Sequence, residues 1–151
     1  MVKMLYANGA ISMETIKAFE EKYNIELPPE YRSFLHEFNG GETTESLYKA
    51  TIKNKPNTLV LNELLGITGK NCDLEWTNNT WNDDIPAGLF VIGVDPGGNG
   101  FLIGLCGTEF EGKVYFLLHD LSVENPMDRV FWVANSFNEF LEGLFENIQD
   151  E

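Results

Sequence analysis

The sequence is poor in the residues that build disulfide scaffolds and metal centres. It has two cysteines and two histidines in 151 residues, and Cys72 and Cys106 lie far apart along the chain. Secreted disulfide-rich domains and zinc sites need several Cys or His residues at short spacings. We therefore expect two reduced thiols, no structural metal and no bound cofactor.

Basic residues are also scarce. Ten Lys and Arg residues stand against 24 Asp and Glu residues, which gives a formal net charge of −14. A field of this sign repels phosphate backbones and anionic lipid surfaces, so direct binding to nucleic acid or to a membrane is not expected. Two interpretations remain open: the charge only keeps the protein soluble, or it complements a basic protein partner.

Long apolar runs are missing as well. No segment approaches the roughly 18 continuous apolar residues of a membrane-spanning helix, and Asn8 and Gly9 interrupt the N-terminal residues before a signal-peptide core is reached. Hydrophobic residues still make up 43% of the chain, and eleven residues are Phe, which is enough for a normal core. The sequence predicts one cytoplasmic globular domain over residues 1–151.

Three segments have the apolar periodicity of amphipathic helices, and they are Ser12–Tyr23, Pro28–Phe38 and Ser136–Asn147. Serine is a favoured N-cap, and proline fits a first helical turn because its missing N–H has no partner there. In the second helix the apolar residues recur at i, i+3, i+4 and i+7. We expect Phe34, in the middle of this stripe, to be buried.

The region between the second and third helices predicts strands. Leu47–Lys53 and Thr58–Leu61 are rich in β-forming residues, 62–65 is expected to form one helical turn, and 66–86 is the longest expected loop. Three further strands joined by short turns predict an antiparallel meander: Leu89–Val94, Phe101–Leu105 and Val114–Leu118. The order of elements indicates an α+β fold, with an antiparallel-rich mixed sheet covered by helices.

The two histidines do not predict a catalytic site. His36 lies off the apolar stripe of its helix, and no nucleophile or paired base is evident near it in the sequence. His119 and Asp120 are neighbours at a strand end, where adjacent side chains point to opposite faces, so they are not expected to form a dyad. We expect no catalytic residue.

The expected loop carries the candidate partner surface. It holds two tryptophans and four acids with no regular calcium-ligand spacing. A tryptophan in a polar loop either folds back onto the core or is displayed to a partner, where tryptophan is a frequent anchor. The six candidate partner-binding residues are Asp73, Glu75, Trp76, Trp81, Asp83 and Asp84. The acidic outer face of the last helix, with Glu139, Glu142 and Glu146, is the next candidate.

Several motifs together resemble one protein family. They are Leu27-Pro28-Pro29-Glu30-Tyr31-Arg32-Ser33-Phe34-Leu35 followed by Asn39-Gly40-Gly41, then Ile85-Pro86-Ala87-Gly88-Leu89-Phe90-Val91-Ile92-Gly93, and finally Val114-Tyr115-Phe116 with Ser136-Phe137-Asn138-Glu139-Phe140-Leu141. In order and spacing they resemble the SUKH superfamily, also called the Knr4-like cell-wall assembly regulator family. Residues 42–84 match its pattern least.

The resemblance implies a binding function rather than catalysis. Many bacterial members of this superfamily are immunity proteins that neutralise toxins, often nucleases, delivered between competing cells, and fungal relatives are regulatory hubs. The resemblance carries over no catalytic motif. It therefore implies a non-enzymatic module that binds a toxin domain. The alternatives are an intracellular regulatory or scaffold domain without a toxin partner and, with least support, a small-molecule enzyme or sensor.

Overall fold

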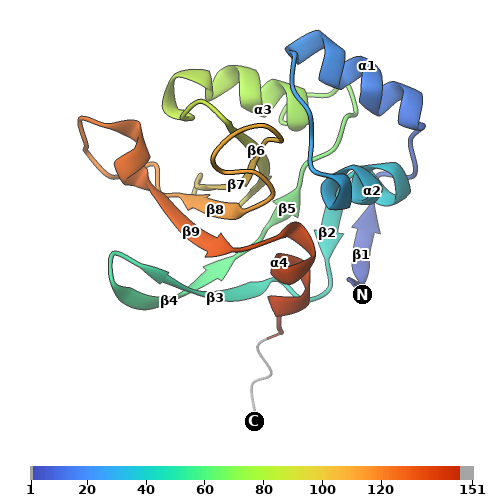
Figure 1. The fold of residues 1–151 in the computed structure, drawn as a ribbon. Coiled ribbons are helices and arrows are strands. Elements are labelled where there is room, and N and C mark those ends of the chain that lie inside the picture. Colours follow the sequence, from blue (N-terminus) through green and yellow to red (C-terminus); the bar gives the residue numbers. More distant parts are fainter. Residues whose placement is uncertain (1, 147–151) are drawn as a thin grey trace.

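A computed structural model describes residues 2–146 and has the α+β architecture that the sequence predicts (Figure 1). Its main sheet has seven strands in the order β1-β2-β5-β6-β7-β8-β9, and each neighbouring pair is antiparallel. The strands are β1 (Met4–Ala7), β2 (Gly41–Thr43), β5 (Glu63–Leu64), β6 (Leu89–Val94), β7 (Gly100–Gly104), β8 (Val114–Leu117) and β9 (Val130–Ala134).

A hairpin and the helices cover this sheet. The hairpin consists of β3 (Leu47–Ile52) and β4 (Lys55–Val60), and its two turn residues, Lys53 and Asn54, both have positive φ, as a tight hairpin turn requires. The helices are α1 (Met13–Tyr23), α2 (Pro29–Phe38), α3 (Leu74–Thr80) and α4 (Phe137–Gly143), with the short 3₁₀ segments η1 (Asn82–Asp84) and η2 (Pro126–Arg129).

The first two helices confirm the prediction. The Ser12 hydroxyl oxygen accepts a hydrogen bond from the Thr15 amide at 3.1 Å and caps α1. Helix α2 begins after Pro28. Both helices end at an asparagine in the left-handed conformation, Asn24 and Asn39, each with φ of 53°. Asparagine adopts this conformation more readily than most residues do, so it is a suitable stop signal.

Helix α4 begins as expected but is shorter than the sequence predicts. Ser136 caps it through the Glu139 amide at 3.0 Å, yet the helix ends at Gly143 and Leu144 is extended. Phe145 then pairs with Leu47 by two main-chain hydrogen bonds of 2.9 and 3.0 Å. The prediction of a helix to Asn147 is therefore wrong from Leu144 to Glu146, because pairing with β3 replaces the last helical turn. Asn147 lies outside the described residues.

The predicted meander is confirmed, and the remaining strands correct the prediction. Strands β6, β7 and β8 pair antiparallel with Leu102 between Val91 and Tyr115. The helical turn expected at 62–65 is the strand β5. Strands β1, β2 and β9 were not predicted. The first two are short and β9 lacks an apolar–polar alternation, so hydrogen bonding to the sheet decides their conformation.

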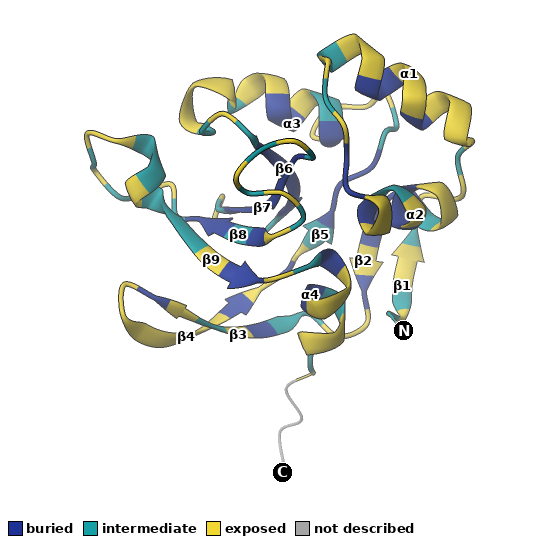
Figure 2. Ribbon diagram, in the orientation of Figure 1, coloured by how far each residue is buried: buried dark blue, intermediate teal, exposed yellow. Residues whose placement is uncertain are grey.

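An aromatic core joins α2, α4 and the sheet. Figure 2 shows the buried residues of these elements in dark blue on the ribbon. The Phe34 ring lies 5.3 Å from the ring of Phe137, and the Phe140 ring lies 5.3 Å from that of Phe101 on β7. Phe34 is only 5% exposed, which confirms its predicted burial. The two helices that carry the family-like motifs are thus fixed against each other by aromatic contacts.

Candidate partner-binding surface

The segment expected as a loop, residues 66–86, contains the helix α3, which corrects the prediction. Asp73 is its N-cap and is only 7% exposed. One carboxylate oxygen of Asp73 accepts from the Trp76 amide at 2.8 Å, and the other accepts from the Thr68 and Gly69 amides at 3.1 and 2.9 Å. Asp73 therefore holds the preceding turn and the start of α3, and it does not present its charge to solvent.

A single amide side chain fixes α3 to the sheet. The buried Asn78 donates to the Val91 carbonyl and accepts from the Val91 amide, both at 2.8 Å. Leu74 and Thr77 pack beside it on the same buried face of the helix. The sequence hides this helix because only one of its buried residues, Leu74, is aliphatic. The local signal for its start was Asp73, because aspartate is a favoured N-cap residue.

Glu75 connects α3 to α1. Its carboxylate accepts from Lys22 Nζ at 2.7 Å and from the Tyr23 hydroxyl. The hydrogen bonds from Lys22 and Tyr23 lower the pKa of Glu75, and the same carboxylate raises the pKa of Lys22. The charge of Glu75 is therefore already compensated within the chain.

The two tryptophans of this segment have different surroundings. Trp81 is half-buried and covers the sheet at Gly100, where an added Cβ atom would lie 2.8 Å from its ring. Trp76 is 39% exposed on the outer side of α3. Of the two alternatives for a tryptophan in this segment, Trp81 folds back onto the core and Trp76 is displayed.

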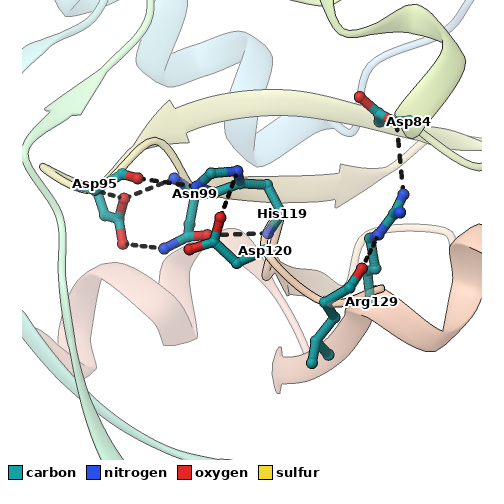
Figure 3. A network of polar contacts seen from close by, with 8 residues as sticks. Asp84, Asp95, Asn99, His119, Asp120 and Arg129 are labelled. Carbon is teal, nitrogen blue, oxygen red and sulfur yellow. Dashed lines mark hydrogen bonds and ion pairs between the residues drawn. The ribbon is translucent and has the colours of Figure 1, made fainter. Parts of the chain in front are cut away.

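Asp83 and Asp84 lie in η1 and are exposed. A guanidinium nitrogen of Arg129, from η2, approaches the Asp84 carboxylate at 3.5 Å, and Arg129 Nε donates to the Leu121 carbonyl at 2.7 Å (Figure 3). The α3–η1 surface thus carries an exposed indole in the first turn of α3 and, after its last turn, two solvated carboxylates, one of which has a basic neighbour.

A second polar network lies at the turn between β6 and β7 (Figure 3). Asp95 accepts from the main chain of Gly97 and Asn99 and from the Asn99 side chain, at 2.7 to 2.9 Å. The Asn99 side-chain oxygen accepts from the His119 amide at 3.0 Å, and His119 Nε2 lies 3.0 Å from the Gly97 carbonyl. The network holds this turn against the end of β8, which is a structural role.

The side chains of His119 and Asp120 do not point to opposite faces, so the expectation that they lie apart is wrong. His119 Nδ1 lies 3.3 Å from the Asp120 carboxylate. Both residues follow β8 in a turn, where the alternation of a strand no longer separates neighbouring side chains. Both are well exposed, and His36 is likewise an exposed residue whose Nδ1 lies 2.7 Å from the Ile11 carbonyl.

The sequence interpretation missed two displayed aromatic residues, Tyr6 on β1, which is 60% exposed, and Trp132 on β9. Trp132 is 50% exposed on β9, opposite Tyr115 of β8. The run of β-branched and aromatic residues at 130–133 was the signal for a strand, although its uniform apolarity does not show which residue points away from the core.

The described part of the chain offers neither a cluster of metal ligands nor a membrane-spanning helix. Within residues 2–146 no group of three or more His, Cys, Asp or Glu side chains is placed to hold a metal ion. No helix in this part of the chain is long and apolar enough to cross a membrane.

Comparison with known proteins confirms the resemblance. The sequence model of the SMI1 / KNR4 family (SUKH-1) matches residues 10–143. The chain is also 28% identical over 148 residues to the SPbeta prophage-derived uncharacterized protein YokK of Bacillus subtilis (strain 168), in a match that covers 88% of this chain and 74% of the relative. The family match spans every helix from α1 to α4.

Proposed function

Because the chain belongs to the SMI1 / KNR4 family (SUKH-1), whose members are commonly immunity proteins, we propose that it is a non-enzymatic, cytoplasmic immunity protein. It binds a toxin domain in a one-to-one complex and blocks it by occupying its surface. The family match over residues 10–143 is the observation that carries this proposal.

The charge of the chain supports a basic partner. With 24 acidic and 10 basic residues, the protein attracts a positively charged surface over a distance of about one Debye length, roughly 8 Å at physiological salt. Proteins that act on nucleic acids carry such surfaces because they must neutralise phosphates. A nuclease toxin is therefore a suitable partner for this protein.

The α3–η1 surface is the proposed contact surface, in a narrower form than the sequence predicts. Trp76 supplies an exposed indole from the first turn of α3, while Asp83 and Asp84 supply solvated carboxylates from η1, which follows the helix. Asp73, Glu75 and Trp81 support this surface from within, because they cap α3, fasten it to α1 and pack it on the sheet. We propose that Trp76 enters an apolar notch of the partner and that the two aspartates meet basic side chains.

The direct test is calorimetric titration of this chain into a toxin domain, chosen as one encoded by a gene adjacent to the gene for this chain. The proposal predicts saturable binding at one molecule per toxin domain, with an affinity that falls as salt is added. A toxin domain that is not bound at micromolar concentrations at low salt would contradict the immunity function. It would favour a regulatory or scaffold domain instead.

A further inference from the structure

A groove between α2 and α4 is the strongest candidate for a second recognition site. It has a volume of about 350 Å³, and its lining residues come from both helices and the N-terminal segment: Val2, Glu30, Ser33, Phe34, Glu37, Phe38, Phe137, Asn138, Leu141 and Glu142. In Figure 1 α4 lies below the start of α2, and the contact between the Phe34 and Phe137 rings joins the two helices. None of these residues belongs to the α3–η1 surface.

The groove has an apolar floor. Phe34 and Phe137 are almost completely buried, so they form its rigid base, while Phe38, Leu141 and Val2 are half-buried and present apolar surface at its opening. Apolar surface that is accessible in a concave site gains free energy when a partner removes it from water. The groove therefore favours an occupant with at least one apolar side chain.

The rim of the groove is acidic. Three of its ten lining residues are glutamates, and none of these ten described residues is Lys or Arg. Glu30 already has a hydrogen-bond partner within the chain. Its carboxylate accepts from the main-chain amide of Asn138 at 2.9 Å, which connects the starts of the two helices. Glu37 and Glu142 are exposed on opposite walls. An occupant must therefore carry positive charge on both sides of its apolar residues.

The spacing of the glutamates along the rim matches the spacing of side chains along one face of a partner helix. Glu30, Ser33 and Glu37 lie at i, i+3 and i+7 on one stripe of α2, so the two glutamates are about 10.5 Å apart along the helix axis at 1.5 Å per residue. A partner helix that lies along the groove repeats its side chains at the same interval. A helix with an apolar stripe flanked by Lys or Arg thus meets both the floor and the rim.

We propose that the groove between α2 and α4 binds a basic amphipathic helix of a protein partner. The proposal rests on the proposed function only for the claim that this chain binds a basic protein, and it adds the site and the form of the bound segment. Apolar side chains of the helix rest on Phe38 and Leu141, while its basic residues meet Glu37 and Glu142.

The probe is a fluorescently labelled amphipathic peptide of leucine and lysine, with lysines on both sides of one leucine stripe. Its binding to the full chain is measured by fluorescence anisotropy at low and at physiological salt. Two control peptides are a scrambled sequence of the same composition and a version with glutamate in place of every lysine. Tight binding of the leucine–lysine peptide, at least ten-fold weaker binding of the scrambled one and no binding of the glutamate one are expected.

Matched variants separate the groove from the overall charge. Glu37→Gln with Glu142→Gln should weaken binding about five-fold at low salt and reduce its salt dependence. Glu109→Gln with Glu124→Gln removes the same number of charges from exposed positions on other elements and should leave the affinity within about two-fold. Leu141→Ala should weaken binding about ten-fold, and Val60→Ala, an exposed apolar residue on β4, should not. Circular dichroism melting checks that each variant is folded.

Equal weakening by the two glutamate pairs would overturn the proposal, since the peptide would then respond only to net charge. Unchanged binding by Leu141→Ala would overturn it as well. The same variants, tested against the toxin domain, distinguish the two proposals. If the toxin domain forms a one-to-one complex whose affinity is unchanged by the groove variants, the immunity function stands and the groove proposal is refuted. Peptide binding in the groove without any toxin binding supports the groove and contradicts the immunity function.

Discussion

Asn78 and Val91 form a closed pair of hydrogen bonds in which one side-chain amide satisfies both main-chain groups of a buried strand residue, each at 2.8 Å. The pair lies where the pairing of β6 with β7 is irregular, between Val91 and Gly93. It connects α3, which carries the proposed partner surface, to the centre of the sheet. Asn78 is therefore the polar contact that fixes α3 to the sheet, beside the contacts of Asp73, Glu75 and Trp81.

Replacing Asn78 with Ala should destabilise the protein by about 2–6 kcal/mol, because two buried main-chain groups lose their partner at about 1–3 kcal/mol each. The free energy of unfolding is measured by urea denaturation. Thr80→Ala, at an exposed position on the same helix, serves as the control and should change it by about 0.5 kcal/mol or less. Equal effects of the two substitutions would mean that Asn78 does not hold α3.

Phe34→Ala should cost about 3–5 kcal/mol, because the ring fills space between Tyr31, Phe38 and Phe137 and its removal leaves a cavity. Thermal unfolding followed by circular dichroism gives the change. Leu5→Ala is the control because it removes an exposed side chain on β1. The melting temperature of this variant should stay close to that of the unchanged protein. An unaltered melting temperature for Phe34→Ala would contradict the assigned core.

The two cysteines should differ in reactivity. Burial, together with a hydrogen bond to Glu26 and nearby carboxylates, raises the pKa of Cys106 to about 11. At pH 8 roughly one Cys106 thiol in a thousand is then a thiolate, which is the reactive form. Cys72 is exposed. Iodoacetamide should therefore alkylate Cys72 well before Cys106 in the folded protein, as followed by mass spectrometry of the intact chain. Modification of both at one rate would contradict the burial of Cys106.

In the proposed α3–η1 surface, different residues should control the association rate and the dissociation rate of the toxin complex. Trp76→Ala should raise the dissociation rate of the toxin complex about thirty-fold, as expected for an anchor residue worth about 2 kcal/mol. Asp83→Asn with Asp84→Asn should mainly lower the association rate and its dependence on salt. Trp132→Ala, which removes an exposed tryptophan on β9, is the control. Stopped-flow fluorescence measures both rates, and identical effects of Trp76→Ala and Trp132→Ala would refute the assigned anchor.

Local signals were sufficient to predict part of the fold. Ser12, Pro28 and Ser136 mark the helix starts where the structure has them, and the turns of the meander follow from glycine and proline. These features act within a few residues, so the sequence reports them directly. The end of α4 depends instead on the pairing of Phe145 with Leu47, and such distant contacts leave no local pattern.

The candidate site was predictable only in outline. The sequence located Trp76, Asp83 and Asp84, but it did not distinguish them from Asp73 and Glu75, which the fold uses for a helix cap and for a contact with α1. Whether an acid is solvated or engaged depends on residues more than 50 positions away, such as Lys22. The groove likewise lies between two helices, α2 and α4, that are far apart in the sequence, so no local pattern predicts it.

The central claim is that this protein inactivates its partner by binding, without turnover, and a titration of toxin activity tests it most directly. A fixed concentration of the toxin domain, well above the dissociation constant, is mixed with increasing amounts of this chain, and the remaining toxin activity is measured. The account predicts a linear fall that ends at one molecule of this chain per toxin domain. Complete inactivation at a small fraction of that ratio, progressing with time, would contradict it, because only a catalyst can inactivate many partner molecules in turn.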